Sequence, residues 1–163
     1  MTSDKIINLD NIEYTLSGNG NEFEADLGPV ANRIGAKHLG YRITRLPPGK
    51  KAFPLHAHYA NEEMFFVLEG QGEVRMGEET HPIRKGDFIA APPDPDCPHQ
   101  IVNSSDRELI YLCVSTMLQP EVGIYPESGK VGIIAGAPPG RSEGGMKKFF
   151  ELDNNVSYWK DEE

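Results

Sequence analysis

The chain has 163 residues, with 16 Lys and Arg against 25 Asp and Glu, so its formal charge is −9 with histidine neutral. This length suits one domain and allows a packed core without a disulfide framework. The acidic balance argues against a nucleic-acid partner, because affinity for a phosphate backbone comes mainly from clustered Lys and Arg. No apolar run approaches the roughly 18 residues of a membrane-spanning helix, so we expect no membrane partner.

The N-terminal residues 1–10 contain no apolar stretch of signal-peptide length. Cys97 and Cys113 are the only cysteines, a count that fits a reducing compartment. We therefore expect a cytoplasmic protein with free thiols.

Residues 1–34 are expected to form an N-terminal extension that packs on the main domain. Short apolar pieces at 6–7 and 12–14 predict edge strands. A polar turn is expected at 18–21, and the second half of the extension is expected to be loop.

Residues 35–118 have the rhythm of a β domain, because Gly and Pro separate short segments rich in Val, Ile, Phe and Tyr. This spacing is typical of an all-β sandwich or barrel in which helices are minor. The predicted strands are 37–46, 63–68, 73–76, 87–91, 99–103 and 108–116.

Residues 119–163 are expected to form a C-terminal tail that packs on the barrel or on a partner subunit. An apolar patch at 131–135 precedes a loop-like stretch at 136–140. Residues 146–152 predict a turn or two of helix. Tyr158 and Trp159 are expected to dock on the barrel or on a second subunit, since exposed Trp is disfavoured and useful at interfaces.

Histidine is scarce, with five residues in all, yet His56 and His58 stand two apart. On a strand, such positions share one face about 6.6 Å apart along the chain, so two imidazoles can converge on one ion. A turn at 59–61 would bring Glu63 back beside them. His99, which begins another apolar strand after a Pro-rich loop, is the fourth candidate ligand.

In these residues the sequence resembles the cupin superfamily over roughly 35–118. The two cupin motifs match, in order, Gly49, His56, His58, Glu63 and Gly70, and then Gly86, Pro92, His99 and Asn103. The resemblance implies a jelly-roll β-barrel or sandwich with extended terminal segments, in which His56, His58, Glu63 and His99 hold one divalent metal ion. Two departures lie in loops: six residues rather than five separate Gly49 from His56, and the loop 93–98 is two residues longer than usual.

Glu62 is an alternative to Glu63, but Glu63 has the six-residue spacing to Gly70. Three imidazoles and one carboxylate would leave two positions of an octahedron open. This ligand set suits Zn, Mn, Fe, Ni or Co, and the sequence does not choose among them. If Glu63 and His99 point inward, alternation places Phe65, Val67 and Ile101 on the same face, where they either line a substrate pocket or pack the core.

Arg42 and Arg45 are three apart on one predicted strand, so at most one of them faces the pocket, where a phosphate-bearing substrate would want a cation. The resemblance favours a metal-dependent enzyme that acts on a small polar metabolite, as a sugar-phosphate isomerase does. The alternatives are a mononuclear-iron dioxygenase and a non-enzymatic cupin that binds a small molecule. The sequence identifies no catalytic base, and the resemblance also implies a homodimer.

Overall fold

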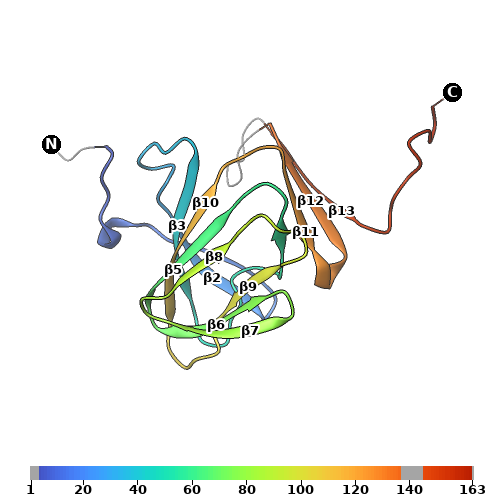
Figure 1. Cartoon of the computed structure of the whole chain (residues 1–163). Helices are drawn as coiled ribbons and strands as arrows, with labels where there is room; N and C mark the ends of the chain where they lie inside the picture. Colours follow the sequence, from blue (N-terminus) through green and yellow to red (C-terminus); the bar gives the residue numbers. More distant parts are fainter. Residues whose placement is uncertain (1–3, 137–144, 163) are drawn as a thin grey trace.

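The computed structural model describes residues 4–136 and 145–162, which are nearly all β (Figure 1). All pairs of neighbouring strands are antiparallel. A six-stranded sheet has the order β1 (Thr15–Asn19), β2 (Phe23–Pro29), β3 (Leu39–Leu46), β10 (Leu109–Thr116), β5 (Glu63–Glu69) and β8 (Phe88–Ala91). A three-stranded sheet has the order β7 (Glu79–Arg84), β6 (Gln71–Met76) and β9 (His99–Val102).

A third sheet belongs mainly to the C-terminal part of the chain. It has the order β13 (Met146–Glu151), β12 (Lys130–Ala135), β11 (Glu121–Tyr125) and β4 (Ala57–His58). Only two short 3-10 turns interrupt the strands in the described residues, η1 (Leu9–Asn11) and η2 (Pro126–Ser128). None of the described helical segments is long and apolar enough to cross a membrane.

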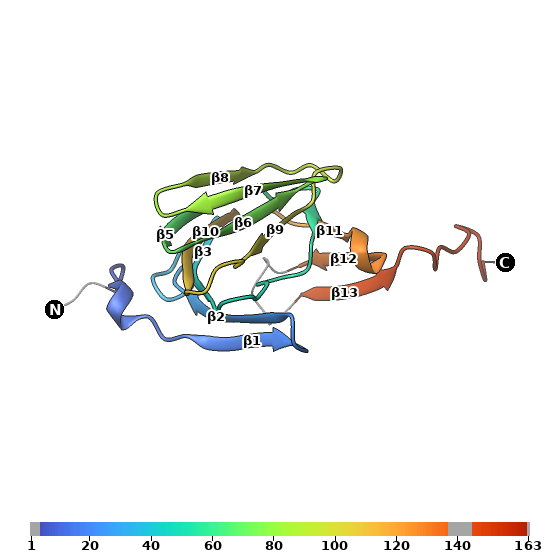
Figure 2. The ribbon, with the colours of Figure 1, turned by 90° about the horizontal axis from the view of Figure 1, so that it is seen from below.

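The main core lies inside the barrel, between the six-stranded and three-stranded sheets. Alternate residues of the strands point into it, and they include Phe65, Val67, Ile101, Tyr111 and Cys113. Figure 2 shows β1 and β2 on one side of the barrel and β7 and β8 on the other. Because the enclosed strands bury one face each, their apolar residues alternate as the sequence predicts.

A second apolar cluster covers the outer face of the six-stranded sheet. Ile12, Val30 and Ile43 form its buried centre, and Tyr14 packs against it. The N-terminal extension therefore packs on the sheet through residues that the sequence analysis assigned to an edge strand. The predicted edge strands at 6–7 and 12–14 are wrong, because these residues lie outside the strands and the first strand is β1. The loop expected in the second half of the extension is also wrong in part, because residues 23–29 form β2, which pairs with β1 and β3.

The turn between β1 and β2 occurs where the polar residues predict it, and Gly20 has a φ of 63° there. Gly70, between β5 and β6, has a φ of 82°, and an added Cβ would meet the carbonyl oxygen of Glu108. A side chain at Gly70 would therefore strain the turn that follows the strand carrying Glu63.

The helix expected at 146–152 is wrong, because these residues form β13. The strand pairs with β12 over its whole length, from Ala135 opposite Met146 to Lys130 opposite Glu151. The exposed edge of β12 offers hydrogen bonds at once, whereas a helix of seven residues would first have to form its costly nucleus. The loop expected at 136–140 lies almost wholly outside the described residues.

The end of the chain extends away from the barrel (Figure 1). Tyr158 and Trp159 contact each other and are 85% and 72% exposed, so within one chain they do not dock on the barrel. Their contact with a second subunit stays a prediction, as do the boundaries expected at residues 34 and 118.

Candidate metal centre

His56 and His58 reach the interior from the short strand β4 and the residue before it. A pair of backbone hydrogen bonds joins His56 to His99: His56 N–H donates to His99 O at 3.2 Å and His99 N–H donates to His56 O at 2.7 Å. The centroid of the His56 ring lies 5.0 Å from that of the His58 ring and 4.7 Å from that of the His99 ring. Three imidazoles from two parts of the chain are thereby held together by the backbone.

Glu63 is the first residue of β5 and points into the same space. Its Oε2 lies 3.1 Å from His99 Nε2 and 3.6 Å from His58 Nε2. The neighbouring Glu62 is exposed, as alternation along the strand requires. The choice between the two carboxylates therefore goes to Glu63.

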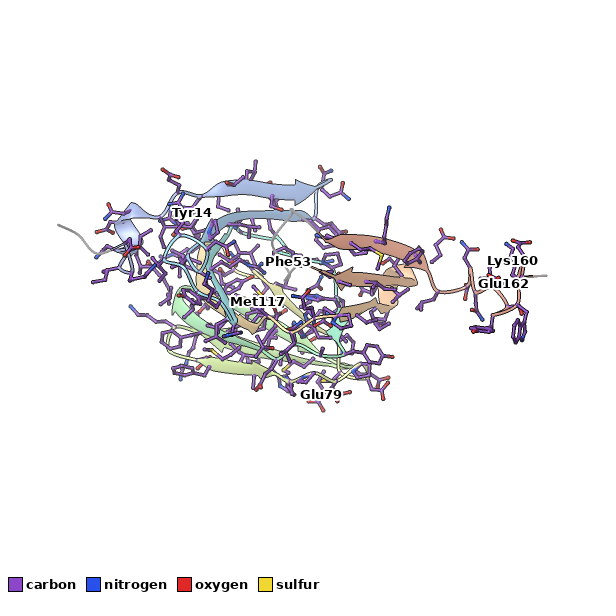
Figure 3. All side chains as sticks on the ribbon, turned by 90° about the horizontal axis from the view of Figure 1, so that it is seen from above. Tyr14, Phe53, Glu79, Met117, Lys160 and Glu162 are labelled. Carbon is purple, nitrogen blue, oxygen red and sulfur yellow. The ribbon has the colours of Figure 1, made fainter. Side chains whose placement is uncertain are left out.

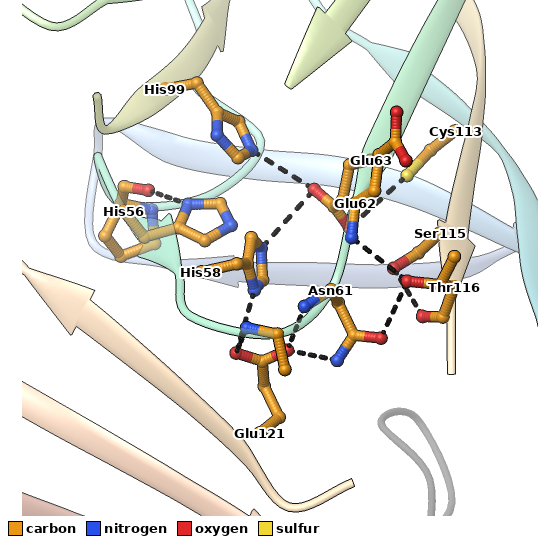
Figure 4. Close-up of polar contacts among 12 residues, drawn as sticks. His56, His58, Asn61, Glu62, Glu63, His99, Cys113, Ser115, Thr116 and Glu121 are labelled. Atoms are coloured by element: carbon orange, nitrogen blue, oxygen red, sulfur yellow. Dashed lines mark hydrogen bonds and ion pairs between the residues drawn. The ribbon is translucent and has the colours of Figure 1, made fainter. Parts of the chain in front are cut away.

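The structure brings together the four residues that the sequence predicts as ligands. One donor atom from each of His56, His58, Glu63 and His99 lies within 4.8 Å of the others (Figure 4). Both ring nitrogens of His58 are buried without a hydrogen bond, and the carboxylates of Glu63 and Glu121 lie 3.6 Å and 3.7 Å from them. Because such buried nitrogens are costly to leave unpaired, and because neutral imidazoles and a carboxylate are ligands of divalent transition metals, the cluster fits a divalent metal site.

The tautomer of His56 is set by the backbone. Its Nδ1 lies 2.8 Å from the carbonyl oxygen of Pro54, so Nδ1 carries the proton and donates it. Nε2 then keeps its lone pair. This arrangement, in which the other ring nitrogen is hydrogen-bonded, is the usual one for a metal-binding histidine.

The cluster also separates the protonation behaviour of its members. Burial, helped by the neighbouring imidazoles, lowers the pKa of His56 to about 4. Burial would also lower the pKa of His58, but the carboxylates of Glu121 and Glu63 outweigh it and raise that pKa to about 9. Burial would raise the pKa of Glu63, yet His58 and His99 hold it well below its usual range. Without a metal, His58 is therefore protonated at neutral pH and lies between the carboxylates of Glu63 and Glu121.

Glu121, at the start of β11, supports the site from the C-terminal sheet. Its Oε1 lies 3.7 Å from His58 Nδ1 and accepts a hydrogen bond from the backbone N–H of Tyr59 at 3.2 Å. Its Oε2 accepts from the backbone and the side chain of Asn61. Glu121 thus orients a ligand and holds the turn that leads to Glu63. Sequence reasoning missed it, and no motif in the chain marks it.

Two further groups near the site were not identified from the sequence as parts of it. Cys113 Sγ lies 3.9 Å from Glu63 Oε1, and burial raises the pKa of this thiol to about 12. The Tyr125 ring stacks on His56, with centroids 5.9 Å apart and an angle of 15°. Burial, with the nearby carboxylates, raises the pKa of Tyr125. Both groups therefore keep their protons at neutral pH.

A cavity of about 150 Å³ adjoins the cluster. Its lining includes Glu63, Cys113, Arg42, Ser115 and Met117. Phe65, Val67 and Ile101 share the inward face with Glu63 and His99, but they pack within the core cluster and do not line this cavity. Their contact with a substrate stays a prediction.

The remaining motif residues have structural roles. Asn103 is fully buried, and its side-chain amide donates to the carbonyl oxygens of Leu46 and Arg107 at 2.7 Å. Cys97 and Cys113 are free thiols. The longer loop at 93–98 leaves His99 in register, because His99 still pairs with His56 across the barrel.

The fold and the site define an antiparallel β-barrel with a three-histidine, one-glutamate centre, and the comparisons with known proteins agree. The model of the cupin domain family matches residues 42–115. Residues 42–115 are therefore a cupin domain, and the nearly all-β architecture is the jelly-roll type that the sequence predicts.

Relatives at the sequence level match about two fifths of the chain. An uncharacterized protein of Methanocaldococcus jannaschii is 40% identical over 70 residues, which are 43% of this chain and 54% of that protein. Cupincin of Oryza sativa subsp. indica is 35% identical over 68 residues, which are 39% of this chain and 14% of cupincin. The match therefore spans about half of the archaeal relative and a small part of the plant one.

Solved structures extend the likeness to nearly the whole chain. A sugar phosphate isomerase of the cupin superfamily from Silicibacter pomeroyi has a TM-score of 0.76 at 24% identity, covering 94% of this chain and 97% of that one. A proposed sugar phosphate isomerase from Acidithiobacillus ferrooxidans has the same TM-score at 21% identity, covering 94% and 96%. A predicted oxalate decarboxylase from Thermotoga maritima has a TM-score of 0.60 at 24% identity, covering 69% and 99%. At these identities the likeness establishes the fold.

Proposed function

We propose that the chain is a metal-dependent enzyme that acts on a small polar metabolite, with chemistry like that of a sugar-phosphate isomerase. The observation that carries this proposal is the position of Glu63, which belongs both to the four-ligand cluster and to the lining of the cavity. A molecule in that cavity would lie directly beside the metal centre. The whole-length likeness to two proteins named as sugar phosphate isomerases supports the same choice, since their terminal segments match as well.

The residues divide the work as follows. His56, His58, His99 and Glu63 would hold the ion, which supplies Lewis-acid polarisation of neighbouring substrate oxygens. Isomerisation also needs a group that takes a proton from one carbon and returns it to the next. Glu63 is the carboxylate that lines the cavity, and its Oε1 faces Cys113 rather than the imidazoles. Because Glu63 is also a candidate metal ligand whose pKa is held well below its usual range, its role would be to hold the ion and not to accept this proton.

The same ligand set would serve a mononuclear-iron dioxygenase or a barrel that only binds a small molecule. The cytoplasmic location and the homodimer also remain proposals.

The first experiment is elemental analysis of protein purified without added metal and without a His tag. Zinc, manganese, nickel or cobalt near one per chain supports the isomerase. Iron at that level with oxygen consumption would replace it by the dioxygenase.

Activity is then tested on a panel of aldose and ketose phosphates in deuterated water, followed by NMR. Interconversion with deuterium at the carbon next to the carbonyl supports proton transfer by a protein base. Metal-loaded protein that converts no member of the panel would contradict the isomerase. Protein that neither contains nor takes up a metal would overturn the whole proposal.

A further inference from the structure

Arg42 is the arginine of β3 that faces the inside of the barrel. It lies opposite Cys113 in the register of β3 and β10, and Cys113 belongs to the inner core. Arg45 lies opposite Ile110, on the outer face of the same sheet, with its guanidinium 4.0 Å from the centroid of the Tyr14 ring. The strand therefore separates the two arginines that the sequence left undecided.

The Arg42 side chain has little to hold it in place. Its guanidinium lies 4.6 Å from the centroid of the ring of Phe53, a residue that packs against the inner core and is labelled near the middle of the view in Figure 3. Arg42 Nε is buried without a hydrogen-bond partner, and no carboxylate of the described residues lies within ion-pair distance of the guanidinium. A cation in such surroundings is stabilised mainly by whatever occupies the space beside it.

The space beside Arg42 is the cavity that also contains Glu63. Its volume is about 150 Å³, and it opens to solvent, so one end of a small molecule can enter while the rest extends outward. Ser115 adds a hydroxyl to the lining. One small molecule in the cavity can therefore contact both Arg42 and Glu63, which belongs to the candidate metal centre.

The charges favour an anion there. The net charge of the chain, −9, repels anions in general, so an anion would bind only where the local charge is positive. A divalent ion held by one carboxylate and three neutral imidazoles would leave the centre positive, and Arg42 adds a second positive charge to the lining of the same cavity. The planar guanidinium also matches an oxyanion with two parallel hydrogen bonds, which an ammonium group does not.

We propose that Arg42 is a substrate-binding residue that holds an oxyanion, a carboxylate or a phosphate, of a molecule whose other end lies at the metal centre. This inference rests on the proposed function, because it places the anion of the substrate relative to the metal. It narrows the substrate class to small anionic metabolites.

The test uses metal-loaded protein and two probes, inorganic phosphate and glycolate, titrated by calorimetry. The variants are Arg42→Met and Arg42→Lys, with Arg45→Met as the matched control on the opposite face of the same strand. We expect Arg42→Met to weaken binding of the preferred probe by about tenfold to a hundredfold and Arg42→Lys by less. Arg45→Met should bind as the wild type does. The probe that binds more tightly tells a carboxylate from a phosphate.

Elemental analysis of each variant separates the two proposals. A wild-type protein that neither contains nor takes up a metal would overturn the proposed function. A metal-loaded Arg42→Met variant that binds the probes as tightly as the wild type would overturn only the role of Arg42.

A measurement on the wild type covers the case in which Arg42→Met does not fold. The Nε–H signals of the two arginines are assigned in nitrogen-15 spectra with the Lys variant and the Arg45→Met control. The Arg42 signal should shift on addition of the preferred probe, while that of Arg45 stays in place. An Arg42 signal that neither probe shifts would overturn the inference.

Discussion

Two strands of the same C-terminal sheet have opposite relations to the metal centre. β11 lies between β12 and β4, and it places Glu121 against His58 and Tyr125 against His56. β13 lies at the edge of the sheet, and each of its residues is exposed. The two strands of this C-terminal segment thus have different roles. β11 contributes residues to the candidate metal centre, whereas β13 only covers the edge of β12.

The largest effect is expected from removing two of the candidate metal ligands, because the role of β11 depends on the metal centre. His56→Ala combined with His58→Ala should abolish metal binding, because two of four donor atoms disappear while the β framework keeps its core. Elemental analysis and circular dichroism measure the two outcomes. His81→Ala, at an exposed histidine outside the cluster, is the control. A double variant that keeps one metal per chain would refute the site.

The contribution of β11 is tested by Glu121→Gln. The amide keeps the shape but removes the charge that orients His58, so metal affinity should fall by roughly tenfold to a hundredfold, the range found when outer partners of metal ligands are changed. Competition with a chelator measures the affinity. Glu151→Gln, on the exposed strand β13, should leave the affinity unchanged. Equal losses in both variants would erase the difference between the strands.

The metal-free protein should be most stable near pH 6.5. His56 has its pKa lowered from 6.5 to about 4, so its contribution is gained as the pH rises through that window. His58 has its pKa raised from 6.5 to about 9, so its contribution is complete below pH 6.5 and is lost as the pH rises through 9. Urea unfolding between pH 4 and pH 10 measures both sides of this maximum.

Glu121→Gln should reduce the loss of stability of the metal-free protein above pH 6.5, since Glu121 is a cause of the raised pKa of His58. Bound metal should remove that fall, because it takes the place of the proton on His58. A metal-free protein whose stability still rises between pH 6.5 and pH 9 would contradict the assignment of charge within the cluster.

The smallest expected effect belongs to β13. Phe150→Ala should change the free energy of unfolding by less than about 1 kcal/mol, because the side chain is half exposed and lies outside both core clusters. Thermal unfolding of the metal-loaded protein measures it. A loss of several kcal/mol would show that β13 is buried in solution, as a contact with a second subunit would make it.

The metal ligands could be predicted from the sequence because their relations are local. His56 and His58 are held to one face by the period of an extended chain, and Glu63 returns after a short turn. Six strands of the barrel, β3, β5, β6, β8, β9 and β10, were predictable for the same reason, whereas β4 and β7 were not predicted. His99 was accessible only through its motif, since 40 residues of chain lie between it and His58.

The errors fall where neighbours in space decide the structure. Residues 146–151 are a strand because the edge of β12 is available to them, and residues 23–29 are a strand because they pair with β3. The sequence of each segment does not reveal its partner strand. A short segment without a strong hydrophobic period becomes a strand only where a neighbouring strand is available to pair with it.

The sequence by itself thus determined the all-β class, the alternation that buries the core and the four candidate ligands. Periods of two and short spacings carry all of these except His99, which depends on its motif. Only the tertiary structure decided that Arg42 faces the cavity while Arg45 faces outward, and that Glu121 reaches His58 from a strand more than 60 residues away. The physical reason is register: the pairing of distant strands selects which side chains meet, and no single strand contains that information.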